Sequence, residues 1–123
     1  MESIANYNIE ETISVNGPSS IFVARHKKLG RKTFLKIYDG KDKTLIERFE
    51  REAKIVADLN SDSIVQIYDF GEWNGKFYIS MEYVEGYNLE TYLQTQQPDI
   101  NTLIDFSIQI IKAVILLHNK GYI

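Results

Sequence analysis

The chain has 123 residues, enough for one modest domain, and a net charge of −3. Hydrophobic residues make up 44% and aromatic residues 12% of it, which allows a packed core and excludes an intrinsically disordered chain. The absence of cysteine excludes disulfides and thiol chemistry, and the even mixture of charges gives no basic stripe for nucleic acid. His26 and His118 are far apart in sequence, so no metal site is expected.

The N-terminal residues lack the charged and apolar regions of a signal peptide. The longest apolar run, at residues 108–117, is interrupted by Lys112 and is too short to cross a bilayer. We therefore expect a cytoplasmic chain with no membrane partner.

The predicted secondary structure is five antiparallel strands with one helix inserted after the third, followed by two further helices. The strands are expected at residues 7–15, 21–26, 32–38, 64–70 and 76–84, and the helices at 44–59, 89–94 and 101–119. Asn74-Gly75 is a strong hairpin signal because a type I′ turn needs two residues with positive φ. Thr44 and Glu47 have the spacing of a capping box, and Asn88 is expected to cap the second helix. Gly121 is expected to stop the last one. The fold class is therefore α+β.

Two charged residues lie among apolar ones. Alternation along Lys32–Tyr38 puts Lys36 on one face with Phe34 and Tyr38. Glu52 falls within the apolar stripe of the first predicted helix, which consists of Leu45, Phe49, Ala53 and Val56. An unpaired buried charge costs roughly several kcal/mol. We therefore hypothesise an ion pair between Lys36 and Glu52. The alternative is that Lys36 faces solvent and Glu52 lies at the rim of the stripe.

The last predicted helix has almost no polar face in its second half. Its apolar residues are Leu103, Ile104, Phe106, Ile108, Ile110, Ile111, Val114, Ile115, Leu116 and Leu117. Such a helix is normally buried all round. We expect it to be covered by downstream sequence or by another chain, and to drive self-association if the chain is expressed alone.

Six segments resemble, in the right order, the first half of a eukaryotic-type protein kinase domain. Residues 7–37 are similar to its first three strands, with Lys36 on the strand lysine and Glu52 on the helix glutamate that holds it. Residues 60–65 look like the family's Asn-His-Pro-Asn-Ile-Val, 79–86 like the hinge between the lobes, and 116–123 like the helix end before the catalytic loop. The resemblance implies an ATP-binding N-lobe at 1–84, with a five-stranded antiparallel sheet and one helix. It also implies that 85–123 form the hinge exit and the first two helices of an incomplete C-lobe.

The resemblance also implies roles for single residues. Lys36, held by Glu52, would pair with the ATP α- and β-phosphates. The Glu82 carbonyl and the Val84 amide would meet the adenine edge, and Met81 would be the gatekeeper behind it. The alternative for Met81 is ordinary core filling, which is compatible with the first reading.

The sequence departs from the family pattern at the nucleotide site. The Gly-x-Gly-x-x-Gly positions hold Ser14, Asn16 and Ser19, Ile21 takes the place of the family's valine, and Gly17 is the one glycine left. Phe34 replaces the usual alanine two residues before the lysine. Its ring is expected to fill part of the adenine site and to weaken ATP binding or alter the pocket.

The chain ends immediately before the place for His-Arg-Asp. The catalytic aspartate and the family's magnesium ligands are therefore expected to be missing, with Mg²⁺ belonging to the complete domain. Asp99 and Asp105 are interpreted as cap-region or surface residues.

Three hypotheses remain open. The first is the N-terminal part of a protein kinase that transfers phosphoryl groups to a protein hydroxyl, Ser/Thr by family frequency, and is inactive as this piece alone. The second is a pseudokinase or kinase-like interaction module with weak or no ATP binding. The third is a generic α+β domain with an accidental likeness to kinases.

Overall fold

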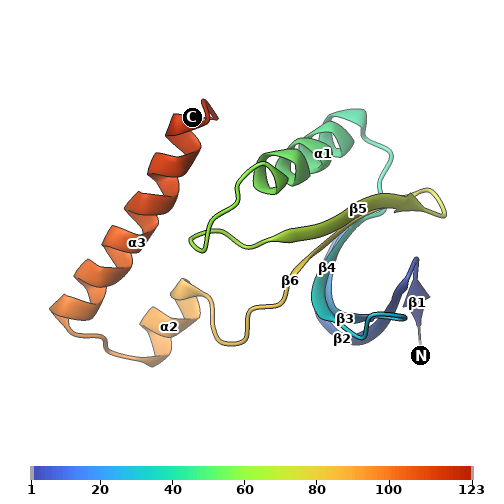
Figure 1. Cartoon of the computed structure of the whole chain (residues 1–123). Helices are drawn as coiled ribbons and strands as arrows, with labels where there is room; N and C mark the ends of the chain where they lie inside the picture. Colours follow the sequence, from blue (N-terminus) through green and yellow to red (C-terminus); the bar gives the residue numbers. More distant parts are fainter. Residues whose placement is uncertain (1, 123) are drawn as a thin grey trace. The chain divides into compact units, whose positions relative to one another are not determined.

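The computed structural model describes residues 2–122, which form two compact units. The first unit runs to Asn60 and includes Val65–Tyr83, and the second consists of Ser61–Ile64 and the chain from Val84 onward. The described chain contains the strands β1 (Ser3–Ile4), β2 (Tyr7–Asn16), β3 (Ser19–His26), β4 (Lys32–Tyr38), β5 (Ile67–Trp73) and β6 (Lys76–Glu82). Its helices are α1 (Lys43–Ala57), α2 (Leu89–Thr95) and α3 (Ile100–Asn119) (Figure 1).

The first unit is an antiparallel sheet with the strand order β1-β2-β3-β4-β6-β5 and α1 packed beside β5 and β6 (Figure 1). The five strands predicted from the sequence are present, but β5 begins and ends three residues later than the predicted 64–70. The sixth, β1, is a two-residue strand that pairs Ser3 with Asn8 at the edge of the sheet. It is too short to show a hydrophobic period, which is why the sequence did not indicate it. An antiparallel sheet with one helix after β4 and two further helices agrees with the predicted α+β class.

The sheet has a separate core on each face. Leu35 and Ile37 of β4 belong to a cluster that contains no α1 residue, whereas Tyr38 packs with Phe49 and Ala53 of α1. Consecutive strand residues point to opposite faces, so the alternation predicted for β4 is confirmed. As a result, α1 is fixed to one face through a narrow line of contacts.

The turn and the caps follow the sequence except at α1. Asn74 and Gly75 have φ of 48° and 75°, which agrees with the predicted hairpin turn. Asn88 and Asp99 cap α2 and α3 through the backbone N–H of Thr91 and of Thr102. The capping box predicted at Thr44 and Glu47 is wrong. Asp42 is the N-cap of α1 and accepts from the Thr44 N–H at 2.9 Å, because the helix begins one residue before Thr44.

In the second unit, the Tyr92 ring of α2 meets the Phe106 ring of α3 edge-on, with centroids 5.4 Å apart. No residue of α3 is buried, and its apolar side chains are extensively exposed. The judgement from the sequence that this region is too short to cross a bilayer considered only the run at 108–117, whereas α3 has 20 residues. With a mean hydropathy of 1.7, it is the one helix in residues 2–122 long and apolar enough to cross a membrane, a property shared by core helices of soluble proteins. Self-association through α3 stays a prediction.

Candidate functional site

The predicted ion pair is present in the first unit. Lys36 Nζ lies 3.2 Å from Glu52 Oε1 and 3.3 Å from Oε2, so the ammonium of β4 is held by a carboxylate of α1. The Lys36 Nζ atom also lies 5.9 Å from the centre of the Phe49 ring. Strand and helix therefore fix one cation at the margin of the contact between them.

The reason given for the pair from the sequence is partly wrong. The Glu52 side chain is 51% exposed and that of Lys36 is 28% exposed. Only Phe49 and Ala53 of α1 are buried, so the apolar stripe is narrower than its sequence pattern and Glu52 lies at its rim. The pair joins two partly hydrated groups, and the Lys36 side chain keeps part of its surface exposed.

The turn between β2 and β3 carries the loop residues singled out in the sequence. Asn16 pairs with Ser19 and Ser14 with Ile21, and Gly17 has a φ of 60° between them. A Cβ at Gly17 would meet nothing within 4 Å, so this glycine serves the left-handed backbone and not a close contact. The register also pairs Ile21 with Lys36, which places the two side by side on adjacent strands.

The remaining predicted residues lie where β4 meets β6. Phe34 pairs with Met81 and Thr33 with Glu82, whose backbone N–H donates to the Gln66 carbonyl at 2.8 Å. Val84 belongs to the second unit and is 53% exposed. The structure therefore brings eight of the nine predicted nucleotide-site positions onto the sheet of the first unit: Ser14, Asn16, Ser19, Ile21, Phe34, Lys36, Met81 and Glu82. Their role in binding ATP stays a prediction.

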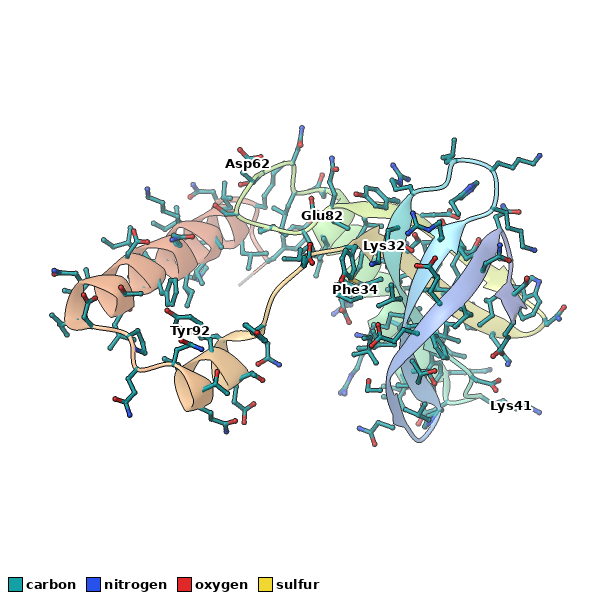
Figure 2. The ribbon with its side chains drawn as sticks, turned by 90° about the horizontal axis from the view of Figure 1, so that it is seen from below. Lys32, Phe34, Lys41, Asp62, Glu82 and Tyr92 are labelled. Atoms are coloured by element: carbon teal, nitrogen blue, oxygen red, sulfur yellow. The ribbon has the colours of Figure 1, made fainter. Side chains whose placement is uncertain are left out.

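Sequence reasoning missed the aromatic partner of Phe34. The rings of Phe34 and Tyr83 have centroids 4.9 Å apart at an interplanar angle of 49°. The Lys32 ammonium lies 4.4 Å from the centre of the same Tyr83 ring. Figure 2 shows Lys32 and Phe34 projecting from β4 near Glu82 at the end of β6. The strand predicted at 76–84 included Tyr83, but β6 ends at Glu82, and the sequence interpretation assigned no partner to the Tyr83 ring.

The face of the sheet without α1 holds a buried polar group. The Tyr78 hydroxyl donates to Asp69 Oδ2 at 3.2 Å, and Tyr78 is 8% exposed. Burial, together with the negative charge of Asp69, raises the pKa of Tyr78 to about 12. Burial also raises the pKa of Tyr7, whose ring lies 6.1 Å from that of Tyr78. These groups stabilise the sheet on the side opposite the ion pair.

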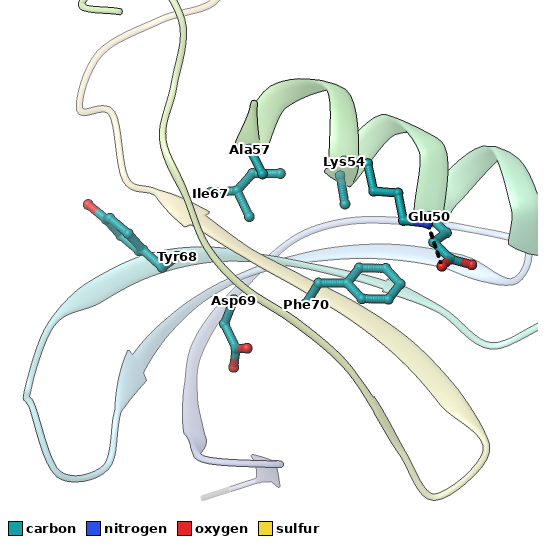
Figure 3. Close-up of a pocket in the computed structure, with 8 residues that line it drawn as sticks. Glu50, Lys54, Ala57, Ile67, Tyr68, Asp69 and Phe70 are labelled. Atoms are coloured by element: carbon teal, nitrogen blue, oxygen red, sulfur yellow. Dashed lines mark ion pairs between the residues drawn. The ribbon is translucent and has the colours of Figure 1, made fainter. Parts of the chain in front are cut away.

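A cavity of about 290 Å³ lies between α1 and β5 (Figure 3). Ala53 and Ala57 line its helix side, and Ile67 and Phe70 its strand side. Figure 3 shows Asp69 directed away from the helix and a Glu50–Lys54 pair at the margin. The cavity includes neither Lys36 nor Glu52, so it is separate from the candidate site.

Comparison with known proteins identifies this fold. Residues 7–123 match the family described as Protein kinase domain. The crystal structure of the PknI kinase domain of Mycobacterium tuberculosis superposes with a TM-score of 0.80 at 20% identity, covering 98% of this chain and 50% of that one. The chain belongs to the protein kinase domain family.

The chain is also similar in sequence to two bacterial proteins. The probable serine/threonine-protein kinase CA_C1728 of Clostridium acetobutylicum is 33% identical over 121 residues, and the serine/threonine-protein kinase PrkC of Bacillus subtilis is 34% identical over 118. These alignments cover 95% and 93% of this chain. The chain spans 18% of the length of each relative.

Proposed function

We propose that this chain is the ATP-binding portion of a serine/threonine protein kinase, whose parent transfers the γ-phosphoryl group of ATP to a protein hydroxyl. The observation that carries the proposal is the Lys36–Glu52 pair, in a chain of this family, with the lysine 28% exposed. The names of the bacterial relatives support Ser/Thr as the acceptor class. We assign residues 1–84 to the N-lobe and 85–123 to the start of the C-lobe, and we place the domain in the cytoplasm, where ATP is available.

In this proposal Lys36 presents its ammonium to the α- and β-phosphates. Because Glu52 already holds it at 3.2 Å, less side-chain freedom is lost when the ligand binds. Ile21, the neighbour of Lys36 on β3, gives the ligand an apolar wall. The short polar side chains Ser14, Asn16 and Ser19 would replace the usual glycines as hydrogen-bonding groups near the phosphates.

The base would be bound at the end of β6. We assign the Glu82 carbonyl and the Val84 amide to the base edge and Met81 to the back of the pocket. Met81 is partly buried against the α1-side core, so it fills the core and can limit the pocket at the same time. Backbone donors and acceptors suit this role because a strand end presents them in a fixed direction.

Phosphoryl transfer needs groups other than the ATP-binding residues assigned above. Magnesium neutralises phosphate charge in the complete domain, and no three metal-ligating side chains cluster within residues 2–122. We propose that the 123-residue chain does not transfer phosphoryl groups by itself, because the residues assigned above bind and orient ATP and none is assigned as the base or the magnesium ligand that the family's reaction uses. Turnover of radiolabelled ATP by this chain would contradict that.

A kinase-like interaction module without useful ATP binding is the second candidate. The contact between Phe34 and Tyr83 and the glycine-poor β2–β3 turn favour it. Both features act against a close fit of nucleotide to the sheet.

Thermal unfolding with and without millimolar Mg-ATP separates the two candidates. A ligand that binds only the folded state raises the unfolding temperature. We expect a rise for the unmodified chain, no rise for Lys36→Ala, and an unchanged rise for Lys54→Ala. The last variant is a matched control, because it removes the same charge from an exposed ion pair on α1. A rise that Lys36→Ala retains, or none in any variant, would contradict the proposed site.

A further inference from the structure

The face of β4 that carries Lys36 is open in only one direction along the strand. Toward its end, Tyr38 is 4% exposed and packs against the Phe49 ring, with centroids 6.2 Å apart. Toward its start, Phe34 is only partly buried. Residues two apart on a strand share a face and are separated by roughly 7 Å. A nucleotide whose phosphates bind Lys36 must therefore extend its sugar and base toward Phe34.

That direction is occupied by the contact between Phe34 and Tyr83. Their rings lie 4.9 Å apart, and the Lys32 ammonium faces the Tyr83 ring at 4.4 Å. The Tyr83 ring therefore contacts both a cation and a phenyl ring, which are carried by the same face of β4. Such contacts fix an aromatic side chain in place.

We propose that the Phe34–Tyr83 pair closes the base-binding position, so that a nucleotide binds only when Phe34 moves off Tyr83. This inference rests on the proposed function and deepens it, because it assigns Phe34 as the residue that limits base affinity at that site. The phosphate position at Lys36 stays open while the base position is filled. The chain therefore binds a bare polyphosphate almost as well as it binds ATP.

The size of the effect follows from the ring pair. An aromatic pair of this kind is worth about 0.5–1.5 kcal/mol, which converts to a change of about two- to twelvefold in a dissociation constant. Removing the Phe34 ring should recover that factor for any ligand with a base. It should leave a ligand without a base unaffected.

The test compares Mg-ATP with magnesium tripolyphosphate by equilibrium dialysis, using the 123-residue chain and its Phe34→Ala, Tyr83→Ala and Lys36→Ala variants. We expect Phe34→Ala to bind ATP about two- to twelvefold more tightly and tripolyphosphate unchanged. Tyr83→Ala frees the Phe34 ring without shortening a β4 side chain, so it should shift ATP affinity in the same direction. If Phe34→Ala does not fold, the ATP affinity of Tyr83→Ala alone tests whether the ring pair closes the base-binding position.

The outcomes separate this inference from the proposed function. If both ligands bind through Lys36 but neither ring variant tightens ATP, the closed position is wrong and the proposed function stands. Weaker ATP binding in these variants means that the rings stack on the base, which also overturns the inference. If no variant binds either ligand in a way that Lys36→Ala abolishes, both ideas fail.

Discussion

The ion pair between Lys36 and Glu52 should contribute little to folding stability, although it organises the candidate site. Its Nζ–Oε1 distance of 3.2 Å gives roughly 1 kcal/mol of attraction at the dielectric constant of water. Glu52 is half exposed, and fixing two long side chains costs entropy, so the net coupling should be about 0.2–1 kcal/mol. The perturbation is a double-mutant cycle with Lys36→Met and Glu52→Gln.

The assay is urea unfolding followed by fluorescence of Trp73, the single tryptophan of the chain, which packs against the core of the sheet. Equal midpoints at two protein concentrations would show that association through α3 does not enter the measurement. A parallel cycle on Lys54 and Glu50, 3.3 Å apart on α1, provides an exposed reference pair that should give about 0.3–0.5 kcal/mol. A coupling above about 2 kcal/mol for Lys36 and Glu52 would refute the reasoning, because only a largely dehydrated pair couples so strongly.

Three further predictions concern other parts of the chain. The pKa of Tyr78 rises from 10.0 to about 12 on folding, so the folded state holds this proton more tightly than the unfolded state. The stability that this gives is present below pH 10 and is lost between about pH 10 and 12. Unfolding measured across this alkaline range should show the loss, and Tyr78→Phe should remove it. Thr33 Oγ1 is buried without a hydrogen-bond partner among residues 2–122, so Thr33→Val should change the free energy of unfolding by less than about 0.5 kcal/mol or raise it, as measured in urea. Ile111 of α3 is 56% exposed, so light scattering should show association of the chain and a smaller assembly for Ile111→Lys; a monomer before substitution would contradict this.

The sequence predicted the sheet well because its signals are local. Alternation along β4 and the Asn74-Gly75 turn fixed the faces and the hairpin, and both agree with the structure. The start of α1 was misplaced because Asp42 and Thr44 are both good capping residues, and the spacing to Glu47 favoured the wrong one. Element ends depend on such small differences in free energy.

The candidate site was predicted only in part from the sequence. The partnership of Lys36 and Glu52 was found, but the burial of Glu52 was overestimated, because periodicity gives the direction of a helix residue and not the width of the contact. The Phe34–Tyr83 pair was missed because the strand was predicted to continue to residue 84, whereas it ends at Glu82 and Tyr83 lies just beyond it. Contacts made by residues outside regular elements require coordinates.

The ion pair and the apolar contacts of α1 differ in how much they contribute to the position of the helix. A weak, half-hydrated ion pair does not position a helix, so α1 is positioned mainly by Phe49 and Ala53 in their core with Tyr38 and Ile79. The ion pair then follows the helix: its geometry is correct when the packing is correct. The direction of the Lys36 ammonium, and with it the capacity of the site for anions, therefore depends on apolar contacts that touch no ligand.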